Sequence, residues 1–304
     1  MTVAAIQLAA ELGNVSTNLQ KALDLVHKAA NARPTLIVLP EFFTSAMALS
    51  PVMEEVALKN REHKVPQRLF EAAQRFHSAI AGSYLNIVKG QVYNTMLLQF
   101  PDGRRFFHNK DLPTQFENRY YTAGDSLRAL DGIGVALCWE MLRTQTVAQM
   151  PPDLQIVAAG SCWWDVAGDR STVLRDYNHV LNQETPQRFA ALLGAPVVHA
   201  AHVGKVTGSR NSTDSSLVER QLIGTTQIVN SSGKTQCQLS VADGDGVLVD
   251  NVELPRRRKP RHLANGFWIT SLHREYLMAW DRENSLGQDF YAANRLRMIE
   301  KVAT

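Results

Sequence analysis

The sequence predicts a mixed α/β fold, in which strands alternate with helices and with hairpins. Residues 3–8 form an apolar run, residues 17–34 carry apolar side chains at helical spacing, and residues 35–39 form a second apolar run. A strand, a helix and a strand in succession are typical of an α/β layer. Hairpins later in the chain add antiparallel strands, so we expect a mixed sheet rather than a purely parallel Rossmann or TIM arrangement.

Local signals indicate the remaining elements. Thr17 and Gln20 have the spacing of a capping box at the start of the first helix, and Pro66 opens a second helix. A turn at residues 101–103 (Pro-Asp-Gly) predicts a hairpin, and Gly194 ends a long helix. The other predicted elements are strands at residues 79–88, 93–100, 105–110, 133–137, 154–159, 196–200 and 246–254, a hairpin over residues 225–239, and helices at residues 140–150, at 171–193 and from 286 onward.

Composition limits the class of protein. The 304 residues, with 45% hydrophobic and 20% charged side chains, are typical of an ordinary soluble globular protein of one large domain or two small ones. A net charge of +3 is too weak to demand a polyanionic partner, so we expect no nucleic acid. Three cysteines fit a reducing cytoplasm better than a disulfide framework. No apolar run approaches the ~18 residues of a membrane span, and the start lacks a basic signal region, so we expect a cytoplasmic protein.

The composition shifts at Pro255, where a basic cluster begins (residues 256–261, Arg-Arg-Arg-Lys-Pro-Arg). We interpret this cluster as a solvated linker or a salt-bridging segment rather than a nucleic-acid contact. The following tail is too short to bury a core alone. We therefore expect a main domain over residues 1–255, and a basic linker and helical tail over residues 256–304 that packs on the domain or on a partner subunit.

Cys138 is the candidate nucleophile. The strand at residues 133–137 ends at this cysteine, and the helix expected after it begins where backbone N–H groups converge. A free cysteine is usually a small buried hydrophobe. However, Glu41 and Lys110 also follow predicted strands, and one sheet edge would bring all three side chains together. Alone, each of these charged residues is more typical of a solvated surface position, but together they form a Glu–Lys–Cys constellation.

Motifs around these residues resemble the nitrilase superfamily, the carbon–nitrogen hydrolases. The resemblance extends over about residues 1–255. It is carried by residues 3–8 (Val-Ala-Ala-Ile-Gln-Leu), 36–41 (Leu-Ile-Val-Leu-Pro-Glu), 110–113 (Lys-Asp-Leu-Pro) and 137–140 (Leu-Cys-Trp-Glu), and more weakly by residues 224–229. It implies a four-layer α-β-β-α sandwich, usually paired into homodimers or larger homo-oligomers.

The resemblance also implies a role for each residue. Glu41 is the general base, Lys110 the charge stabiliser, Cys138 the nucleophile, and Glu117 the second carboxylate that positions the lysine and the substrate. A free thiol has a pKa of about 8.5, so we expect Glu41 to take the thiol proton, and Lys110 and the helix start to favour the resulting thiolate. Lys110 and the backbone N–H of Trp139 would hold the oxyanion. Attack on an amide gives a thioester, attack on a nitrile gives a thioimidate, and neither needs a metal or another cofactor.

The substrate class stays open among small amides, nitriles and N-carbamoyl compounds. Trp139 and Glu140, which we expect to support the substrate or the oxyanion, lean towards nitrilases, whereas residues 39–44 lean towards amidases. Trp163 is a candidate wall of the acyl pocket, although aromatic core packing explains it equally well. Cys162 and Cys237 are interpreted as structural residues, and His199 and His202, three apart in a strand, should face opposite sides rather than share a metal.

Two other classes of function remain as alternatives to hydrolysis of a carbon–nitrogen bond. An N-acyltransferase would pass the same thioester to an amine. A non-catalytic scaffold would use the basic tail to contact a partner. The intact set of Glu41, Lys110 and Cys138 favours a hydrolase that releases ammonia and a carboxylic acid from a small molecule.

Overall fold

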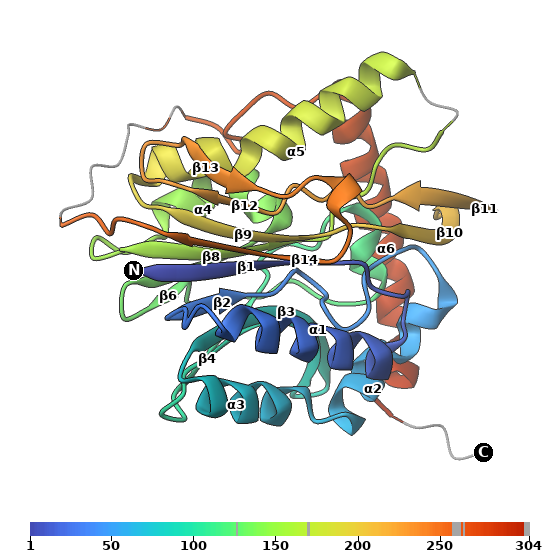
Figure 1. Cartoon of the computed structure of the whole chain (residues 1–304). Coiled ribbons are helices and arrows are strands. Elements are labelled where there is room, and N and C mark those ends of the chain that lie inside the picture. Colours follow the sequence, from blue (N-terminus) through green and yellow to red (C-terminus); the bar gives the residue numbers. More distant parts are fainter. Residues whose placement is uncertain (126, 169–170, 257–262, 264, 301–304) are drawn as a thin grey trace.

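Parallel strands lie at the centre of the protein, as the computed structural model shows for residues 1–125, 127–168, 171–256, 263 and 265–300 (Figure 1). Within these residues, twelve strands form one sheet with the main order β5-β4-β3-β2-β1-β9-β8-β7-β6; β14 pairs with β1, and β12 joins β9 to β13. The strands of this sheet are β1 (Thr2–Leu8), β2 (Leu36–Val38), β3 (Ala79–Val88), β4 (Gln91–Gln99), β5 (Arg105–Asn109), β6 (Ala129–Leu130), β7 (Ile133–Leu137), β8 (Ile156–Ser161), β9 (Val197–His202), β12 (Gln227–Val229), β13 (Thr235–Gln238) and β14 (Gly246–Asn251).

The sheet is mixed, which confirms the predicted α/β class. β1 runs parallel to β2 and β9, β2 to β3, and β8 to β7 and β9. The pairs at the periphery, such as β3 with β4 and β1 with β14, are antiparallel.

The helices are α1 (Val15–Ala30), α2 (Val56–Glu62), α3 (Val65–Phe76), α4 (Thr144–Ala148), α5 (Thr172–Leu193) and α6 (Arg274–Ile299), with 3-10 turns η1 (Pro51–Glu55), η2 (Gln115–Arg119), η3 (Cys138–Leu142) and η4 (Val241–Asp243).

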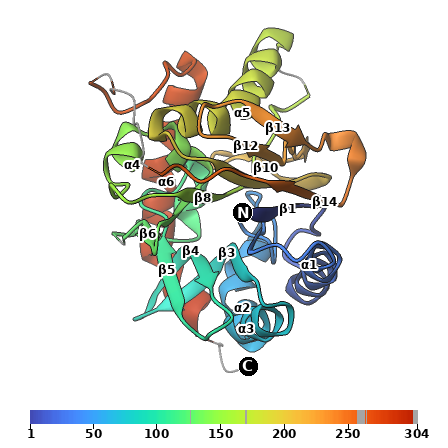
Figure 2. The same cartoon turned by 60° about the vertical axis from the view of Figure 1, so that its left-hand side comes forward.

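Helices cover the strands from two sides. Figures 1 and 2 show α1 and α3 on one side of the strands and α5 on the other. Along β1 the side chains alternate as the strand period requires: Ala4 and Ile6 pack in the apolar cluster that contains α1, whereas Val3 and Ala5 face a cluster shared with β7, β8 and β9. The predicted four-layer description of this arrangement stays a prediction.

Several helix ends differ from the sequence expectation. Asn14, not Thr17, caps α1, because its side chain accepts the backbone N–H of Thr17. α5 ends at Gly194 as predicted, with φ of 64°. The tail helix α6 begins at Arg274, twelve residues before the expected start. Residues 140–150 form a 3-10 turn and the five-residue helix α4 instead of one helix.

Two further features complete the fold. The hairpin of β10 (Lys205–Asn211) and β11 (Asp214–Gln221) is a separate two-stranded sheet that the sequence pattern did not indicate. Most of the predicted basic cluster (residues 257–261) lies outside the described residues. Among the helices of the described part of the chain, none has both the length and the apolarity needed to cross a bilayer.

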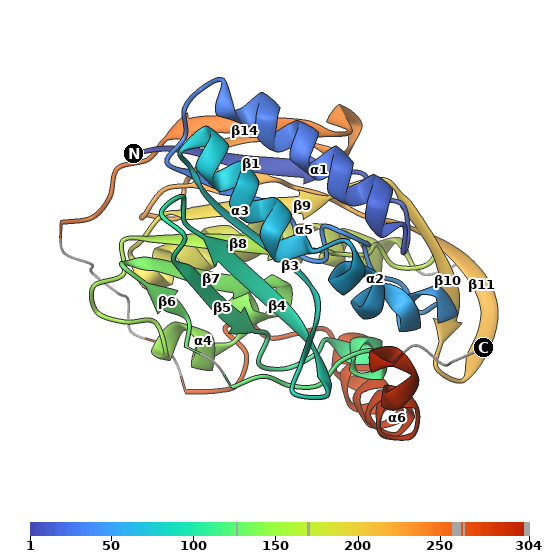
Figure 3. The same ribbon diagram turned by 90° about the horizontal axis from the view of Figure 1, so that it is seen from below.

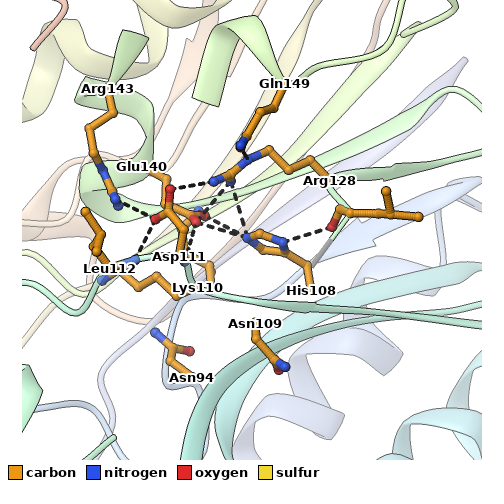
Figure 4. A network of polar contacts seen from close by, with 12 residues as sticks. Asn94, His108, Asn109, Lys110, Asp111, Leu112, Arg128, Glu140, Arg143 and Gln149 are labelled. Atoms are coloured by element: carbon orange, nitrogen blue, oxygen red, sulfur yellow. Dashed lines mark hydrogen bonds and ion pairs between the residues drawn. The ribbon is translucent and has the colours of Figure 1, made fainter. Parts of the chain in front are cut away.

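A buried network of charged side chains holds the turn after β7 (Figure 4). The carboxylate of Glu140 accepts the backbone N–H groups of Leu137 at 2.8 Å and Asp111 at 3.0 Å. Arg128 donates to the same carboxylate at 3.0 Å, and His108 Nε2 lies 3.0 Å from it. Burial opposes ionisation, but His108 and Arg128 hold the pKa of Glu140 well below its usual range. Glu140 thus joins the end of β7 to the segment after β5.

Asp111 extends the network. Its carboxylate lies 2.6 Å from Arg128 and 2.5 Å from Arg143, the largest fully buried side chain among the described residues. Lys110 precedes Asp111, and Cys138 lies between Leu137 and Glu140 in the chain. The network therefore fixes the backbone at Lys110 and at Cys138.

We expect Glu140→Gln to lower the stability by about 3–5 kcal/mol, because the neutral amide breaks a buried ion pair with Arg128, which keeps only the carboxylate of Asp111. Thermal and denaturant unfolding measure this loss. Glu71→Gln is the matched control, since the Glu71 carboxylate lies 3.8 Å from Arg68 on the exposed face of α3; it should change the stability by less than about 1 kcal/mol. Equal stability of the Glu140 variant and the wild type would contradict this account.

Gly160 in β8 is a point of close approach to the segment after β2. A Cβ there would lie 2.7 Å from the backbone nitrogen of Glu41. We expect Gly160→Ala to lower the stability by roughly 1–3 kcal/mol, because backbone must move to admit the methyl group. Gly168→Ala is the control, because nothing lies within 4 Å of its added Cβ. If both variants unfold at the same temperature, the close approach does not limit stability.

Candidate active site

Three charged side chains meet in the interior next to the end of β7. Lys110 follows β5, and its Nζ lies 2.9 Å from Oε1 of Glu41 and 2.8 Å from Oε2 of Glu117. Glu41 comes three residues after the end of β2, and Glu117 lies in η2. All three side chains have no exposed surface. The structure therefore brings together three residues that the sequence placed at separate strand ends or in a loop.

The groups around Glu41 act on the pKa of its carboxyl group in opposite directions. Asn94 of β4 donates to Oε1 at 2.9 Å, and the backbone N–H of Cys162 donates to Oε2 at 3.1 Å. Burial raises the pKa of Glu41 to about 7, with the charge of Glu117 adding to the rise and Lys110 opposing it. A carboxyl group with a pKa near 7 is suited to take up and return a proton near neutral pH.

Lys110 remains a cation despite its burial. Burial alone would lower the pKa of Lys110, but the carboxylates of Glu117 and Glu41 raise it well above its usual range. Glu117 is itself held by the backbone N–H of Thr114 at 2.9 Å and by the Tyr121 hydroxyl. A fixed ammonium of this kind is an electrostatic partner for a developing oxyanion.

Cys138 lies at the turn between β7 and η3 with φ of 48°, a left-handed backbone conformation that is rare for residues other than glycine. Such conformations cost about 1–3 kcal/mol and cluster at functional sites. Burial raises the pKa of the thiol well above its usual range, with the charge of Glu41 adding to the rise and Lys110 opposing it. Lys110 thus favours the thiolate as predicted, but burial outweighs it, and η3 is a turn of only five residues rather than the expected helix.

A pocket of about 180 Å³ opens onto the thiol. Cys138 and Cys162 lie among its lining residues, whereas Glu41, Lys110 and Glu117 are fully buried and do not line it. The two cysteines therefore belong both to the pocket wall and to the surroundings of the buried charges. Of the other predicted residues, Trp139 and Trp163 line the pocket.

Glu140 does not line this pocket, and its carboxylate is held by the network of Figure 4. Its predicted role in supporting the substrate therefore has no geometric basis. Trp139 packs parallel to Trp280 with ring centroids 5.6 Å apart. Its backbone N–H is in the first turn of η3, where N–H groups have no acceptor within the helix. Trp163 donates its indole N–H to Asn178 at 2.9 Å.

The two histidines of β9 have separate partners, and both are buried. His199 Nε2 lies 2.8 Å from the hydroxyl of Ser161, which also hydrogen-bonds to Cys138. His202 Nε2 lies 2.7 Å from the backbone carbonyl of Glu41. Burial lowers the pKa of each histidine to about 4. Among the described residues, no group of three or more His, Cys, Asp or Glu side chains is arranged to hold a metal ion.

Asn94, Tyr121 and Ser161 are neighbours of the site that were not predicted from the sequence, and Cys162 was predicted to be only structural. Asn94 carried a weak signal, since it is a polar residue inside an apolar strand. Ser161 comes directly after Gly160, which pairs with Leu137 across β7 and β8, so it lies beside Cys138 only through strand register. That register is a tertiary property.

Known proteins share the fold. A carbon–nitrogen hydrolase from Helicobacter pylori G27 superimposes with a TM-score of 0.71 at 17% identity, covering 83% of this chain and 90% of that one. A mutant amidase from Nesterenkonia sp. AN1, with acrylamide added to its active-site cysteine, gives 0.64 at 19% identity, covering 84% and 94%. A CN-hydrolase superfamily protein from Xanthomonas campestris, with an arsenic adduct in its active site, gives 0.60 at 16% identity, covering 82% and 89%.

Sequence comparison identifies the family. No curated protein sequence matches the chain at a significant level. A model of the carbon–nitrogen hydrolase family matches residues 2–261. Because this match spans most of the 304 residues, the chain belongs to the carbon–nitrogen hydrolase family.

Proposed function

We propose that the protein hydrolyses a small amide through a thioester on Cys138. The observation that carries this proposal is the ion pair of Glu41, whose pKa is about 7, with Lys110; both charges act on Cys138, which has a left-handed backbone and lines a pocket. The thiol is protonated at rest, so a nearby base is needed to generate the nucleophile.

In the first half of the reaction, Glu41 takes the thiol proton as the sulfur attacks the amide carbon. The carbonyl oxygen becomes an oxyanion, which the ammonium of Lys110 and the backbone N–H of Trp139 stabilise. The tetrahedral intermediate collapses, the carbon–nitrogen bond breaks, and Glu41 returns its proton to the leaving nitrogen. Ammonia departs and the acyl group stays on Cys138 as a thioester.

In the second half, Glu41 takes a proton from water as the water oxygen attacks the thioester. The second tetrahedral intermediate breaks its carbon–sulfur bond, the carboxylic acid leaves, and Glu41 returns the proton to the sulfur of Cys138. The same residue therefore acts twice as base and twice as acid, for which a pKa near the working pH is suited.

An amide is favoured over a nitrile. Glu140, one of the residues that lean towards nitrilases, does not line the pocket, and its carboxylate is occupied by Arg128 and two backbone N–H groups. The structurally similar Nesterenkonia protein is an amidase that carries an acrylamide adduct on its cysteine. Nitriles and N-carbamoyl compounds belong in the same assay panel, and added amine would reveal transfer of the acyl group instead of hydrolysis. We also propose that the protein is cytoplasmic and forms a homodimer or a larger homo-oligomer.

We expect Cys138→Ala to lower the release of ammonia from a panel of small amides by at least about 10⁴-fold, because no nucleophile remains. Cys237→Ala is the matched control, since this cysteine lies in β13 and its thiol contacts Asp250 rather than the pocket. Intact mass should show an acyl adduct on the wild type and the control, and none on Cys138→Ala. Full turnover by Cys138→Ala would refute the mechanism.

The pH dependence of kcat/KM should report Glu41. Since the base must be ionised, kcat/KM should fall tenfold per pH unit below a midpoint near pH 7, where burial sets its pKa. Asn94→Ala removes a donor to the carboxylate, so its pKa and the acid limb should move to higher pH. Asn86→Ala, on the neighbouring strand β3, should leave the profile unchanged. A wild-type midpoint near 4.5 would exclude Glu41 as the titrating base.

A further inference from the structure

We infer that α6, which lies beyond the residues matched by the family model, forms one wall of the substrate pocket and limits the length of an apolar acyl group. This inference rests on the proposed function and adds to it the residues that select the substrate. The family match ends at residue 261, whereas α6 spans Arg274–Ile299. Figure 3 shows α6 nearly end-on at the periphery, away from α1 and α3.

One face of α6 lines the pocket. The lining residues recur with the helical period and are Glu275, Tyr276, Ala279, Arg282 and Glu283. Among these five, Ala279 has the smallest side chain. The pocket also has Phe116 and Trp164 in its wall, whose rings lie 4.8 Å apart, and Cys138 at its base. An acyl group attached to Cys138 therefore occupies a space bounded by aromatic rings and by α6.

The position of this wall is fixed by contacts at several points along the helix. At its N-terminal end, Tyr276 and Trp280 pack against the ring of Trp139, with centroids 5.9 and 5.6 Å away. In the middle, the buried carboxylate of Glu283 accepts the backbone N–H of Ser212 at 3.1 Å. The hydroxyl of Tyr291 accepts the backbone N–H of Val92 at 2.7 Å.

α6 also packs closely on η2, the turn that carries Glu117. Asn118 donates to Asn284 at 2.7 Å. A Cβ on Gly287 would lie 2.7 Å from Cβ of Asn118 and 2.9 Å from the backbone nitrogen of Arg119, so glycine permits this approach. The helix is therefore anchored both to the residue after the nucleophile and to the turn of the second carboxylate. We therefore expect α6 to keep its position and to exclude acyl groups that are too long, instead of moving to admit them.

The acyl group that fits is apolar next to its carbonyl carbon. Trp139 and Trp163 pack with Cys138 in one apolar cluster. The wall also carries charged residues, of which Arg282 pairs with the buried Glu283, Asp165 with Arg175 and Arg210 with Asp214. A straight-chain aliphatic amide suits this lining, with its chain directed towards Ala279.

The test compares Ala279→Leu with Ala292→Leu, the same substitution on the exposed surface of α6. For each variant, kcat/KM is measured with a three-carbon and a six-carbon straight-chain amide. We expect Ala279→Leu to lower the ratio of six-carbon to three-carbon kcat/KM at least about tenfold, since even one methylene in a pocket changes selectivity by 10–200-fold. Ala292→Leu should keep the wild-type ratio within about twofold.

Tyr276→Ala enlarges the pocket and should shift the ratio in the opposite direction, which decides the question if Ala279→Leu does not fold. An unchanged ratio of six-carbon to three-carbon kcat/KM in Ala279→Leu would overturn the inference, whether both kcat/KM values fall or neither does. An unchanged or lower ratio in Tyr276→Ala would overturn it as well.

Alkylation of Cys138 separates this inference from the proposed function. The rates with iodoacetamide and with its N-hexyl derivative, followed by intact mass, need no turnover. If no amide is hydrolysed by the wild type, the proposed function fails. The wall is then still tested, because Ala279→Leu should slow the larger reagent selectively and Ala292→Leu should not. Equal slowing of both reagents by Ala279→Leu would overturn it.

Discussion

The structure depends on one buried cation. The ammonium of Lys110 lies between the carboxylates of Glu41 and Glu117, and none of the three side chains is exposed. Removing each ion from water costs several kcal/mol, which close pairing and additional hydrogen bonds must offset. Asn94 and the Tyr121 hydroxyl supply such bonds to the two carboxylates. These requirements explain why β4, η2 and the ends of β2 and β5 must meet at one place.

A second buried network lies next to the first and has a different task. Glu140 and Asp111 bind Arg128, and Glu140 also accepts backbone N–H groups on both sides of the site. Lys110 and Asp111 are adjacent in the sequence, and Cys138 and Glu140 share η3. One network therefore presents charge to the nucleophile, while the other holds the backbone that carries it. The left-handed φ of Cys138 is tolerated because the turn is fixed in this way.

Sequence reasoning reached the charged core of the site and missed its electrostatics. Strand ends and a family resemblance indicated Glu41, Lys110 and Cys138 because these signals are local. From the same local signals we expected Lys110 and a helix start to favour the thiolate that Glu41 generates, with no measure of burial. Desolvation is the largest influence on the pKa of Cys138 and it acts in the opposite direction. The ion pair of Glu140 with Arg128, twelve residues away in the chain, likewise could not be predicted from a local pattern.

The sequence by itself determined the mixed α/β class, the candidate triad and most strands and helices, though not α2 or the β10–β11 hairpin, because hydrophobic periodicity, turn residues and short motifs are encoded within a few neighbouring positions. Only the tertiary structure decided which side chains surround the triad, which state each proton favours at rest, and that α6 returns to the pocket. Those properties arise from strand register, burial and contacts between residues such as Tyr276 and Trp139, which are 137 positions apart and leave no pattern in either segment.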